Sequence, residues 1–499
     1  MGKPRLGIAS GNRLGAEAAA AVAKAGGNAV DACLASGVMA WVVEPFFASI
    51  GGSGFIAVRS PDKSVEVFDG NNSMPHTIPE SPGTGLKRTY LDYSNGMYTG
   101  IGGGSVAVPG ILKAVQMAWE RHGHIEWAAL FAPAIKAARE GVDFPRTSAY
   151  YLSVTFREIW AQYPEAADLF AEDGLLKVEG EPLVQPELAE ALEMIAEGGP
   201  DVFYSGVLAE EMAEAIENDG GFMGVSDLKQ FEAHARSPIG TWAFNWRVES
   251  NPPPAVGGAV LTHMLALLDQ TDLDDPIERL QAIVEAERAA VGYRGERYQE
   301  PGEIAGGLEE ALSKIQTHPS KSAETTHMST ADSDGYVCAL TESNGYGSGL
   351  IVHGMLLNNT LGEEELNPLG AHRLPPGSRC HSNQAPTIAS NNGICVGIGS
   401  PGADRITGAI AQTLMAIAVD GMSLAEAVAA PRAHLAVKPE GELLCYEPGL
   451  PGDVLETYVP RPYDEPHMFF GAVQAASVRD DGTVDAAHDP RRSGATALV

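Results

Sequence analysis

Residues 323–330 read AETTHMST, and residues 331–350 continue as ADSDGYVCALTESNGYGSGL. The runs THMSTAD and GYVCALTES, rich in β-branched residues and separated by a turn sequence, predict strands. Two adjacent threonines, Thr325 and Thr326, stand at the start of this region, and much of the chain's glycine and asparagine follows them. Such a hydroxyl-rich start, far from either end of a 499-residue chain, requires a physical reason.

The residues immediately before this stretch have a different composition. Residues 299–324, QEPGEIAGGLEEALSKIQTHPSKSAE, are polar and rich in Gly, Pro, Ser and Lys, which is typical of a flexible linker. Helical spacing of apolar residues predicts helices at 14–24, 28–44, 110–140, 186–218, 275–298, 404–419 and 423–430. Further strands are expected in IGGSGFIAVRS, GICVGIGS and AVQAASVRD. The chain is therefore expected to be helix-rich before the linker and β-rich from Thr325 onward.

Composition limits the classes of function. With 33 Lys+Arg against 65 Asp+Glu the formal net charge is −32, so binding to nucleic acid or to an anionic membrane surface is not expected. The charge favours high solubility as its explanation, with an acidic interaction surface as the alternative. No apolar run is long enough to span a membrane, and the N-terminal residues do not form a secretory signal. The five cysteines contain no CxxC pair, which favours a reducing, cytoplasmic compartment over a disulfide framework or a zinc site.

A threonine at the start of a strand, directly after a linker, has one special chemical use. If the bond before Thr325 is cut, its α-amine becomes free, with an ordinary pKa of about 8. The amine is then a general base beside the hydroxyl, so one residue supplies both nucleophile and base. The alternative is that Thr325 and Thr326 are ordinary β-branched strand residues, and spacing alone does not decide between the two.

Other motifs along the whole chain resemble those of the γ-glutamyltransferase (γ-glutamyltranspeptidase) family of N-terminal nucleophile hydrolases. ETTHMST is similar to the family's processing site, whose first threonine becomes the nucleophile. The other matching motifs, in family order, are GGNAVDAC (26–33), VVEPFFASIGGSGF (42–55), VAVPG (106–110), PPPAVGG (252–258), MLLNN (355–359), SNQAPTI (382–388), GSPGADRI (399–406), GAVQA (471–475) and DPRR (489–492). Many separate matches in the right order are far more specific than any single glycine motif.

The resemblance implies an α+β fold, the four-layer αββα sandwich of N-terminal nucleophile hydrolases. It also implies self-cleavage between Glu324 and Thr325. A large subunit, residues 1–324, and a small subunit, residues 325–499, would then form one folded unit, and a homodimer of processed units is one possible assembly. Position 325 would thus become a chain terminus.

The resemblance also assigns catalytic roles. Thr325 is expected to be the nucleophile and, through its amine, the base. Ser343 stands where the family usually has a second threonine that hydrogen-bonds the nucleophile. Gly402 and Ala403 stand where backbone N–H groups form the oxyanion hole, although GSPGAD by itself also fits a tight strand-to-helix turn. His327 is expected to be structural. No metal or organic cofactor is expected; the partners are a small amide substrate and water or an amine acceptor.

The substrate-binding positions depart from the family pattern. Asn71 replaces the arginine that holds a substrate carboxylate, and an amide lacks that charged, bidentate fork. The family's paired serines become Ser382 and Asn383. On the amino-group side Gly345, Thr360 and Glu363 replace asparagine, glutamine and aspartate, and Glu363, in GEEEL, also fits a solvated acidic loop. The segment from Thr360 to Ser382 is shorter than in members with a lid, so an open pocket is expected.

These observations predict a self-processed threonine amidohydrolase or acyltransferase whose γ-glutamyl specificity is in question. Alternatives within the family are acylases for β-lactam side chains and amidohydrolases for small acids such as oxamate. A non-catalytic homologue is opposed by the retention of Thr325, Ser343 and the GSPGA turn. A nucleotide binder is opposed by the negative charge and by the absence of a G-x-x-x-x-G-K-[ST] motif.

Overall fold

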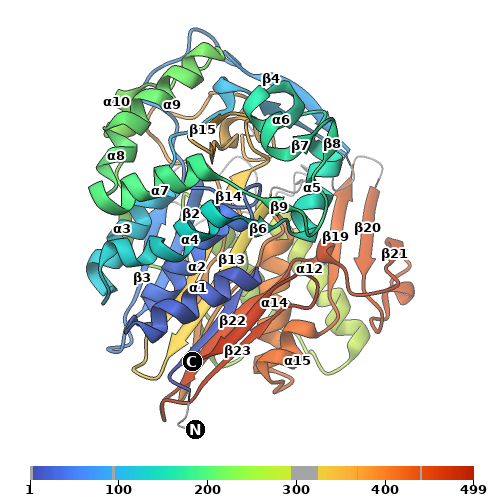
Figure 1. Ribbon diagram of the computed structural model, residues 1–499. Helices are drawn as coiled ribbons and strands as arrows, with labels where there is room; N and C mark the ends of the chain where they lie inside the picture. The colour runs from blue at the N-terminus through green and yellow to red at the C-terminus, as the bar shows by residue number, and fades with distance from the viewer. Residues whose placement is uncertain (1–3, 93–95, 294–323, 368, 439–440) are drawn as a thin grey trace.

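A computed structural model describes residues 4–92, 96–293, 324–367, 369–438 and 441–499 (Figure 1). Most of the predicted linker, residues 299–323, lies outside the described residues. The described chain mixes helices with two large sheets, as an α+β fold does. Both chain ends lie at the bottom of Figure 1, where the Arg5 and Leu6 N–H groups donate to the Val499 carbonyl.

The first sheet has seven strands drawn from both sides of position 325. Its order is β10 (His234–Arg236), β3 (Val65–Gly70), β2 (Ser53–Arg59), β14 (Val337–Gly345), β13 (Glu324–Asp332), β1 (Leu6–Ser10) and β24 (Ala495–Leu498). All of these neighbours pair antiparallel. The central pair is β13 and β14, so the predicted strands THMSTAD and GYVCALTES form the middle of the sheet.

The second sheet has six antiparallel strands and packs against the first. Its order is β11 (Ile239–Ala243), β12 (Trp246–Ser250), β17 (Thr387–Asn391), β18 (Ile394–Gly399), β22 (Gln474–Arg479) and β23 (Val484–His488). Strand β13 lies against β18 and β22. Small and medium apolar side chains fill the space between the sheets, among them Ala331, Ala339, Ile388 and Ala476. Polar residues replace them toward the end of β14, where Thr341 and Ser343 follow in the same alternation.

Helices cover the outer face of each sheet. The first sheet is covered by α1 (Arg13–Lys24), α2 (Ala29–Val43) and α3 (Ile111–His122), with α4 (Trp127–Glu140) and α7 (Pro186–Gly198) stacked beyond them. The second is covered by α11 (Gly257–Leu268), α14 (Arg405–Ala418) and α15 (Leu424–Ala429), with α12 (Pro276–Tyr293) beside α11. Every residue of α2 is buried, and an Asn28–Asp31 capping box fixes its start.

Smaller elements surround this core. They are the helices α5 (Arg146–Thr155), α6 (Pro164–Phe170), α8 (Asp201–Tyr204), α9 (Val207–Asn218) and α10 (Val225–Lys229), and a three-stranded sheet of β19 (Ala433–Lys438), β20 (Gly441–Tyr446) and β21 (Val459–Pro462). Two-stranded pairs are β4 (Lys87–Leu91) with β5 (Met97–Ile101), β6 (Val142–Asp143) with β9 (Pro182–Leu183), β7 (Ala171–Glu172) with β8 (Leu175–Leu176), and β15 (Ile351–Val352) with β16 (Met355–Leu356). The predicted helix at 110–140 is two helices, because Gly123 ends α3.

An aromatic cluster fastens α5 and α6 to the core. Phe46 is fully buried, and its ring centroid lies 5.3 Å from Tyr151, 4.9 Å from Trp160 and 4.6 Å from Phe170. The Tyr151 hydroxyl also donates to the Tyr346 carbonyl just beyond β14, at 2.9 Å. The position of α5 relative to the central strands therefore depends on this cluster.

Replacing Phe46 tests that dependence. Phe46→Ala is expected to lower the free energy of unfolding by about 3–5 kcal/mol, because it leaves a cavity that the surrounding rings only partly fill. Phe46→Leu, the matched control, keeps most of the volume and is expected to lose less. Denaturant titration measures both variants, and equal, sub-kilocalorie losses would show that the cluster does not hold this region.

Candidate active site

The two threonines at the start of β13 point to opposite faces of the sheet. Successive side chains alternate along a strand, so Thr325 faces the second sheet and Thr326 faces α2. The Thr326 hydroxyl donates to Glu44 Oε2 at 2.9 Å. Thr325 pairs with Ser343 across β13 and β14, which places their Cβ atoms about 5 Å apart on the same face. Only the first threonine therefore reaches the predicted partner.

Most of the predicted site residues line one small cavity beside Thr325. The lining residues are Ser53, Asn71, Thr325, Ser343, Thr360, Glu363, Leu366, His381, Ser382, Asn383, Gln384, Ala403 and Ile406. Gly345 lies next to it, because its N–H donates to Ser343 Oγ at 3.1 Å. Gly402 lines a neighbouring cavity, whose wall also includes Arg146 and Arg405. The predicted residues are thus brought together from both sides of position 325.

The cavity beside Thr325 is small in this uncut chain. Its volume is about 20 Å³, and Thr325, Thr360 and Glu363 are all buried. Leu366 and His381, in the segment after Thr360, line it, and the His381 ring donates from Nδ1 to the Leu366 carbonyl at 2.9 Å. The short segment therefore forms part of the cavity wall, while the expectation of an open pocket stays a prediction.

The turn before α14 has the backbone geometry of a candidate oxyanion hole. Gly402 has φ +122° and Ala403 has φ +52°, a left-handed conformation that is uncommon for alanine. Strain of this kind is often retained at functional sites. The turn immediately precedes the N-terminus of α14, whose dipole favours negative charge nearby. Its backbone N–H groups therefore lie in a favourable field for a developing oxyanion.

Glu363 is a buried acid in the cavity wall. It is 2% exposed, so the alternative of a solvated acidic loop is wrong for this residue. Burial, and secondarily the charge of Glu365, raises the pKa of Glu363 well above its ordinary value, while a hydrogen bond with Thr360 lowers it. A Cβ atom at position 345 would lie 2.7 Å from Glu363 Oε1, so glycine there leaves room for the glutamate side chain.

Asn71 is poorly placed to replace a carboxylate-binding arginine. Its Nδ2 donates to the Cys380 carbonyl at 2.6 Å, and its backbone N–H donates to Asp69 Oδ1 at 3.0 Å. The amide group thus already takes part in the internal hydrogen bonding of the protein. It provides no positive charge to the cavity.

Several residues of the cavity wall had no role predicted from the sequence. Gln384 donates from Nε2 to Ser53 Oγ at 3.0 Å, linking the 382–388 motif to the start of β2. Both residues lie inside motifs that resemble those of the family, so the sequence could have indicated them as site residues. Leu366 and His381 lie between Thr360 and Ser382, outside these motifs, and nothing in the sequence indicated them.

The register of the central strands changes at the predicted cleavage site. Glu324 pairs with Gly345 and Thr325 pairs with Ser343, so the ladder skips Asn344. Asn344 is fully buried, and neither atom of its amide group has a hydrogen-bond partner among the described residues. Irregular pairing leaves the backbone locally less constrained than a regular ladder does.

A polar cluster lies behind Thr325 on the α2 side of the sheet. Glu44 accepts hydrogen bonds from Thr326 and from Asn12 Nδ2, the latter at 2.8 Å. Glu342 accepts from Trp41 Nε1 at 3.0 Å, and its other oxygen has no partner among the described residues. Burial raises the pKa of Glu342 to about 8, against an ordinary value of 4.5, and the nearby Glu44 adds to the rise.

His327 is buried away from the cavity, between the two sheets. Its ring nitrogens lie 2.8 Å from the hydroxyls of Thr341 and Ser329, and burial lowers its pKa to about 3. A Cβ atom at Gly399 would lie within 2.3 Å of the ring, so the second sheet leaves space for it. The described contacts are those of a neutral, structural histidine.

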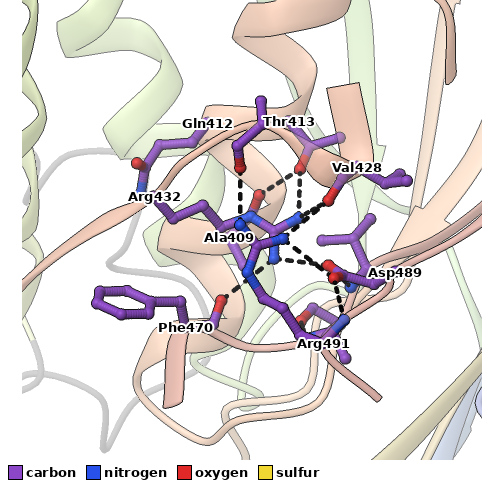
Figure 2. A network of polar contacts seen from close by, with 12 residues as sticks. Ala409, Gln412, Thr413, Val428, Arg432, Phe470, Asp489 and Arg491 are labelled. Carbon is purple, nitrogen blue, oxygen red and sulfur yellow. Dashed lines mark hydrogen bonds and ion pairs between the residues drawn. The ribbon is translucent and has the colours of Figure 1, made fainter. Parts of the chain in front are cut away.

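An ionic cluster supports the loop that follows β23. Arg432 and Arg491 both form ion pairs with Asp489 (Figure 2). Arg432 Nη1 lies 2.7 Å from Asp489 Oδ2, and Arg491 Nη1 lies 3.0 Å from Asp489 Oδ1. Burial alone would raise the pKa of Asp489, but the two guanidinium groups hold it below its ordinary value. The next residue, Arg492, donates from Nη1 to the Thr325 carbonyl at 3.1 Å. The loop therefore connects the ionic cluster to the start of β13.

Among the residues that the structure describes, no group of three or more His, Cys, Asp and Glu side chains is arranged to hold a metal ion. No described helix has both the length and the apolar composition that a membrane span requires.

Comparisons with known proteins agree with this geometry. The family model described as Gamma-glutamyltranspeptidase matches residues 15–499. The chain is similar to the glutathione hydrolase proenzyme of Escherichia coli, with 28% identity covering 94% of this chain and 87% of the relative. It is equally similar to an acylase proenzyme of a Pseudomonas species, with 28% identity covering 99% of this chain and 93% of the relative.

Solved structures show the same fold. Cephalosporin acylase from Bacillus halodurans superposes with a TM-score of 0.84, covering 99% of this chain and 96% of that chain. Because the identity of that pair is 23%, the likeness is evidence for the fold alone.

Replacing Glu342 tests the effect of burial on this acid, which lies on the α2 side of the first sheet. Because its folded pKa is raised, its contribution to stability is full below pH 4.5 and is lost as the pH rises toward 8. Glu342→Gln is expected to gain stability relative to the natural protein across this range, on the order of 4 kcal/mol at its upper end. Unfolding curves measured from pH 4.5 to 8.5 give the difference.

The control for this comparison is Glu179→Gln, an exposed glutamate for which parallel curves are expected. If the free energy of unfolding of Glu342→Gln also changed with pH in parallel with that of the natural protein, the carboxyl group would not be held neutral by its surroundings.

Proposed function

The chain belongs to the gamma-glutamyltranspeptidase family of amide hydrolases and transferases, and we propose that it cleaves itself before Thr325 and then uses Thr325 as its nucleophile. The observation that carries the proposal is the shared cavity, which joins Thr325, Ser343 and Ala403 at the start of the central strand. An ordinary strand threonine would need neither a facing hydroxyl nor a strained turn beside it. The contacts also support the four-layer αββα arrangement as part of this proposal.

Self-cleavage needs only groups already present in the chain and water. The Thr325 hydroxyl attacks the carbonyl carbon of Glu324 and the peptide C–N bond breaks, with the hydroxyl proton passing to the departing nitrogen. The resulting ester is hydrolysed by water, which leaves a carboxylate on Glu324 and a free amine on Thr325. The skipped residue opposite this bond supports an irregular, reactive backbone there. Because both sheets contain strands from before and after position 325, residues 1–324 and 325–499 would stay together after cleavage.

The freed amine then serves substrate turnover. With an ordinary pKa of about 8 it accepts the Thr325 hydroxyl proton as the oxygen attacks a substrate amide carbon. The oxyanion accepts hydrogen bonds from the N–H groups of Gly402 and Ala403, and Ser343 orients the nucleophile. The substrate C–N bond breaks, the amine departs with the proton, and an ester to Thr325 remains. Water or a second amine resolves that ester.

The acyl group that we propose is not γ-glutamyl. Asn71 supplies no charge where an arginine would hold the α-carboxylate, and its Nδ2 already donates to Cys380. Losing a charged partner costs about 1.5–3 kcal/mol, or about 10- to 100-fold in preference. The raised pKa of Glu363 favours a neutral carboxyl group in the same wall, which hydrogen-bonds a polar but uncharged acyl group. A small, polar but uncharged acyl group fits these residues best.

The intact mass of freshly purified protein tests self-cleavage. Two fragments separated between Glu324 and Thr325 are expected for the natural chain, while Thr325→Ala is expected to remain whole because it lacks the attacking oxygen. Thr326→Ala is the matched control and should still be cleaved, since its hydroxyl faces Glu44. An uncut natural chain after long incubation, or a cleaved Thr325→Ala chain, contradicts the proposal.

A substrate panel tests the acyl group separately. Hydrolysis of γ-glutamyl anilide is compared with simple N-acyl and oxamoyl anilides, and kcat/KM is expected to be at least about tenfold higher for an uncharged acyl group. Asn71→Arg is expected to shift the ratio toward γ-glutamyl by restoring the charged fork. A strong, saturable preference of the natural enzyme for γ-glutamyl would show that Asn71 suffices.

A further inference from the structure

A cavity of about 760 Å³ lies where the two sheets end, away from Thr325. Strand β14 runs from this cavity, where Val337 pairs with Arg59, to the active site, where Ser343 pairs with Thr325. Ser343 follows Val337 by six residues, so at about 3.3 Å per residue the cavity is about 20 Å from Thr325. The volume is within the range typical of small-molecule sites. No step of the proposed reaction uses this space.

Strand β2 directs Arg59 into the cavity. Phe55 and Ala57 belong to the apolar cluster between the sheets, and Arg59 follows them in the same alternation along the strand. Ile388 and Val478 belong to the same cluster and line the cavity from the second sheet. Arg59 is 9% exposed, so its guanidinium group lies largely out of water against an apolar floor.

The second sheet adds an exposed indole to the cavity wall. Val248 packs with the helices outside that sheet, so Arg247, its neighbour along β12, points toward the first sheet. Trp242 pairs with Arg247 across β11 and β12, and the side chains of paired residues lie on the same face. Trp242 is 65% exposed. The cavity thus has a flat aromatic surface on one sheet and a buried arginine on the other.

The acidic residues of the cavity wall each have a cationic partner. Glu249 Oε1 lies 3.4 Å from Arg247 Nη2, Asp480 Oδ1 lies 3.6 Å from Lys63 Nζ, and Asp334 Oδ2 lies 3.5 Å from Arg5 Nη2. None of these pairs includes Arg59. The charges of the wall are therefore matched without it.

Arg59 itself has no ion-pair partner within the described part of the chain. Its Nη1 donates to the Gly335 carbonyl, a neutral acceptor, at 2.7 Å. Asp62, in the turn after β2, accepts hydrogen bonds from Ser60 and Ser64 instead. A charge withdrawn from water without an opposite charge beside it is unfavourable, and a bound anion would offset that penalty.

We propose that this cavity binds a small aromatic carboxylate, with the carboxylate on Arg59 and the ring against Trp242. Guanidinium groups bind carboxylates through charge-assisted, often bidentate hydrogen bonds. The apolar floor and the indole suit a flat apolar ring. The net charge of −32 disfavours polyanions, whereas one carboxylate matches the single charge of Arg59. The site is separate from the reaction at Thr325, so this inference does not rest on the proposed function.

Direct binding tests the site. The affinities of 2-naphthoate and of 2-naphthylmethanol for the purified protein are measured by ligand-observed NMR, because the two probes share the ring system and differ in the carboxylate. 2-Naphthoate is expected to bind at least about tenfold more tightly, and Arg59→Gln is expected to remove that advantage. Trp242→Ala, a change at an exposed position that does not disturb folding, is expected to weaken 2-naphthoate about three- to tenfold. Equal affinity of the natural protein for the two probes would overturn the inference.

The matched control is Arg146→Gln. Arg146 is exposed and lines the cavity beside Gly402, so its replacement removes the same charge from a different cavity. The affinity of this variant for 2-naphthoate is expected to equal that of the natural protein. A loss as large as in Arg59→Gln, or an unchanged affinity in Trp242→Ala, would place the acid elsewhere and overturn the inference.

Thr325→Ala separates this inference from the proposed function. The variant lacks the proposed nucleophile but leaves the distant cavity unchanged, so its affinity for 2-naphthoate is expected to match that of the natural protein. A marked loss of affinity in Thr325→Ala would place the acid in the active site and overturn the inference. Unchanged binding in Thr325→Ala supports the distant site whether or not the natural chain cleaves itself.

Discussion

The antiparallel pairing of β13 with β14 is the constraint on which the site depends. The register sets Thr325 opposite Ser343, and the two-residue period of a strand sends Thr326 to the other face. A shift of one residue would exchange the two threonines and place the Thr325 side chain on the face that contains Glu44. The surrounding structure stabilises one register. The Thr326 hydroxyl donates a hydrogen bond to Glu44, and the ring nitrogens of His327 lie within hydrogen-bond distance of the Thr341 and Ser329 hydroxyls.

The same pairing explains why residues distant in sequence form one site. β13 and β14 lie in the middle of the first sheet, with β2 on one side and β1 on the other. Ser53 comes from β2, while the turn at 402–403 follows β18 of the second sheet. Any nucleophile at the start of the central strand is therefore surrounded by residues from both sides of position 325. Cleavage there would change the chain's connectivity without removing a wall of the site.

The charged groups around the site do not reflect the protein's overall negative charge. The surface is acidic, yet Arg432 and Arg491 meet at Asp489 directly behind the loop that carries Arg492. Buried ion pairs add little stability by themselves, but they favour one geometry because any unpaired partner is costly. Here that geometry fixes a guanidinium group on the Thr325 carbonyl. On the opposite face, Glu342 is held neutral by burial.

Periodicity and turn residues predicted the main helices and the central strands, since these depend on local pattern. The motifs also identified most residues of the cavity, because the motifs themselves meet there. Partners across the fold were not predictable: nothing adjacent to Asn71 in sequence indicates that it donates to Cys380. The burial of Glu363 was not predictable either, because the acidic run GEEEL is typical of a solvated loop. The cavity that Arg146 and Gly402 line is formed by α5 and by segments more than 250 residues later in the sequence, and no local pattern predicts it.

The position of the acyl group on the protein during turnover decides whether Thr325 is the nucleophile. Processed enzyme is mixed with a chromogenic amide, quenched in acid within one turnover, digested, and mapped by mass spectrometry. The added acyl mass is expected on the peptide that begins at Thr325, on the Thr325 oxygen. An acyl group on Ser343 or on any other side chain, or full turnover with no covalent adduct at any quench time, would contradict it.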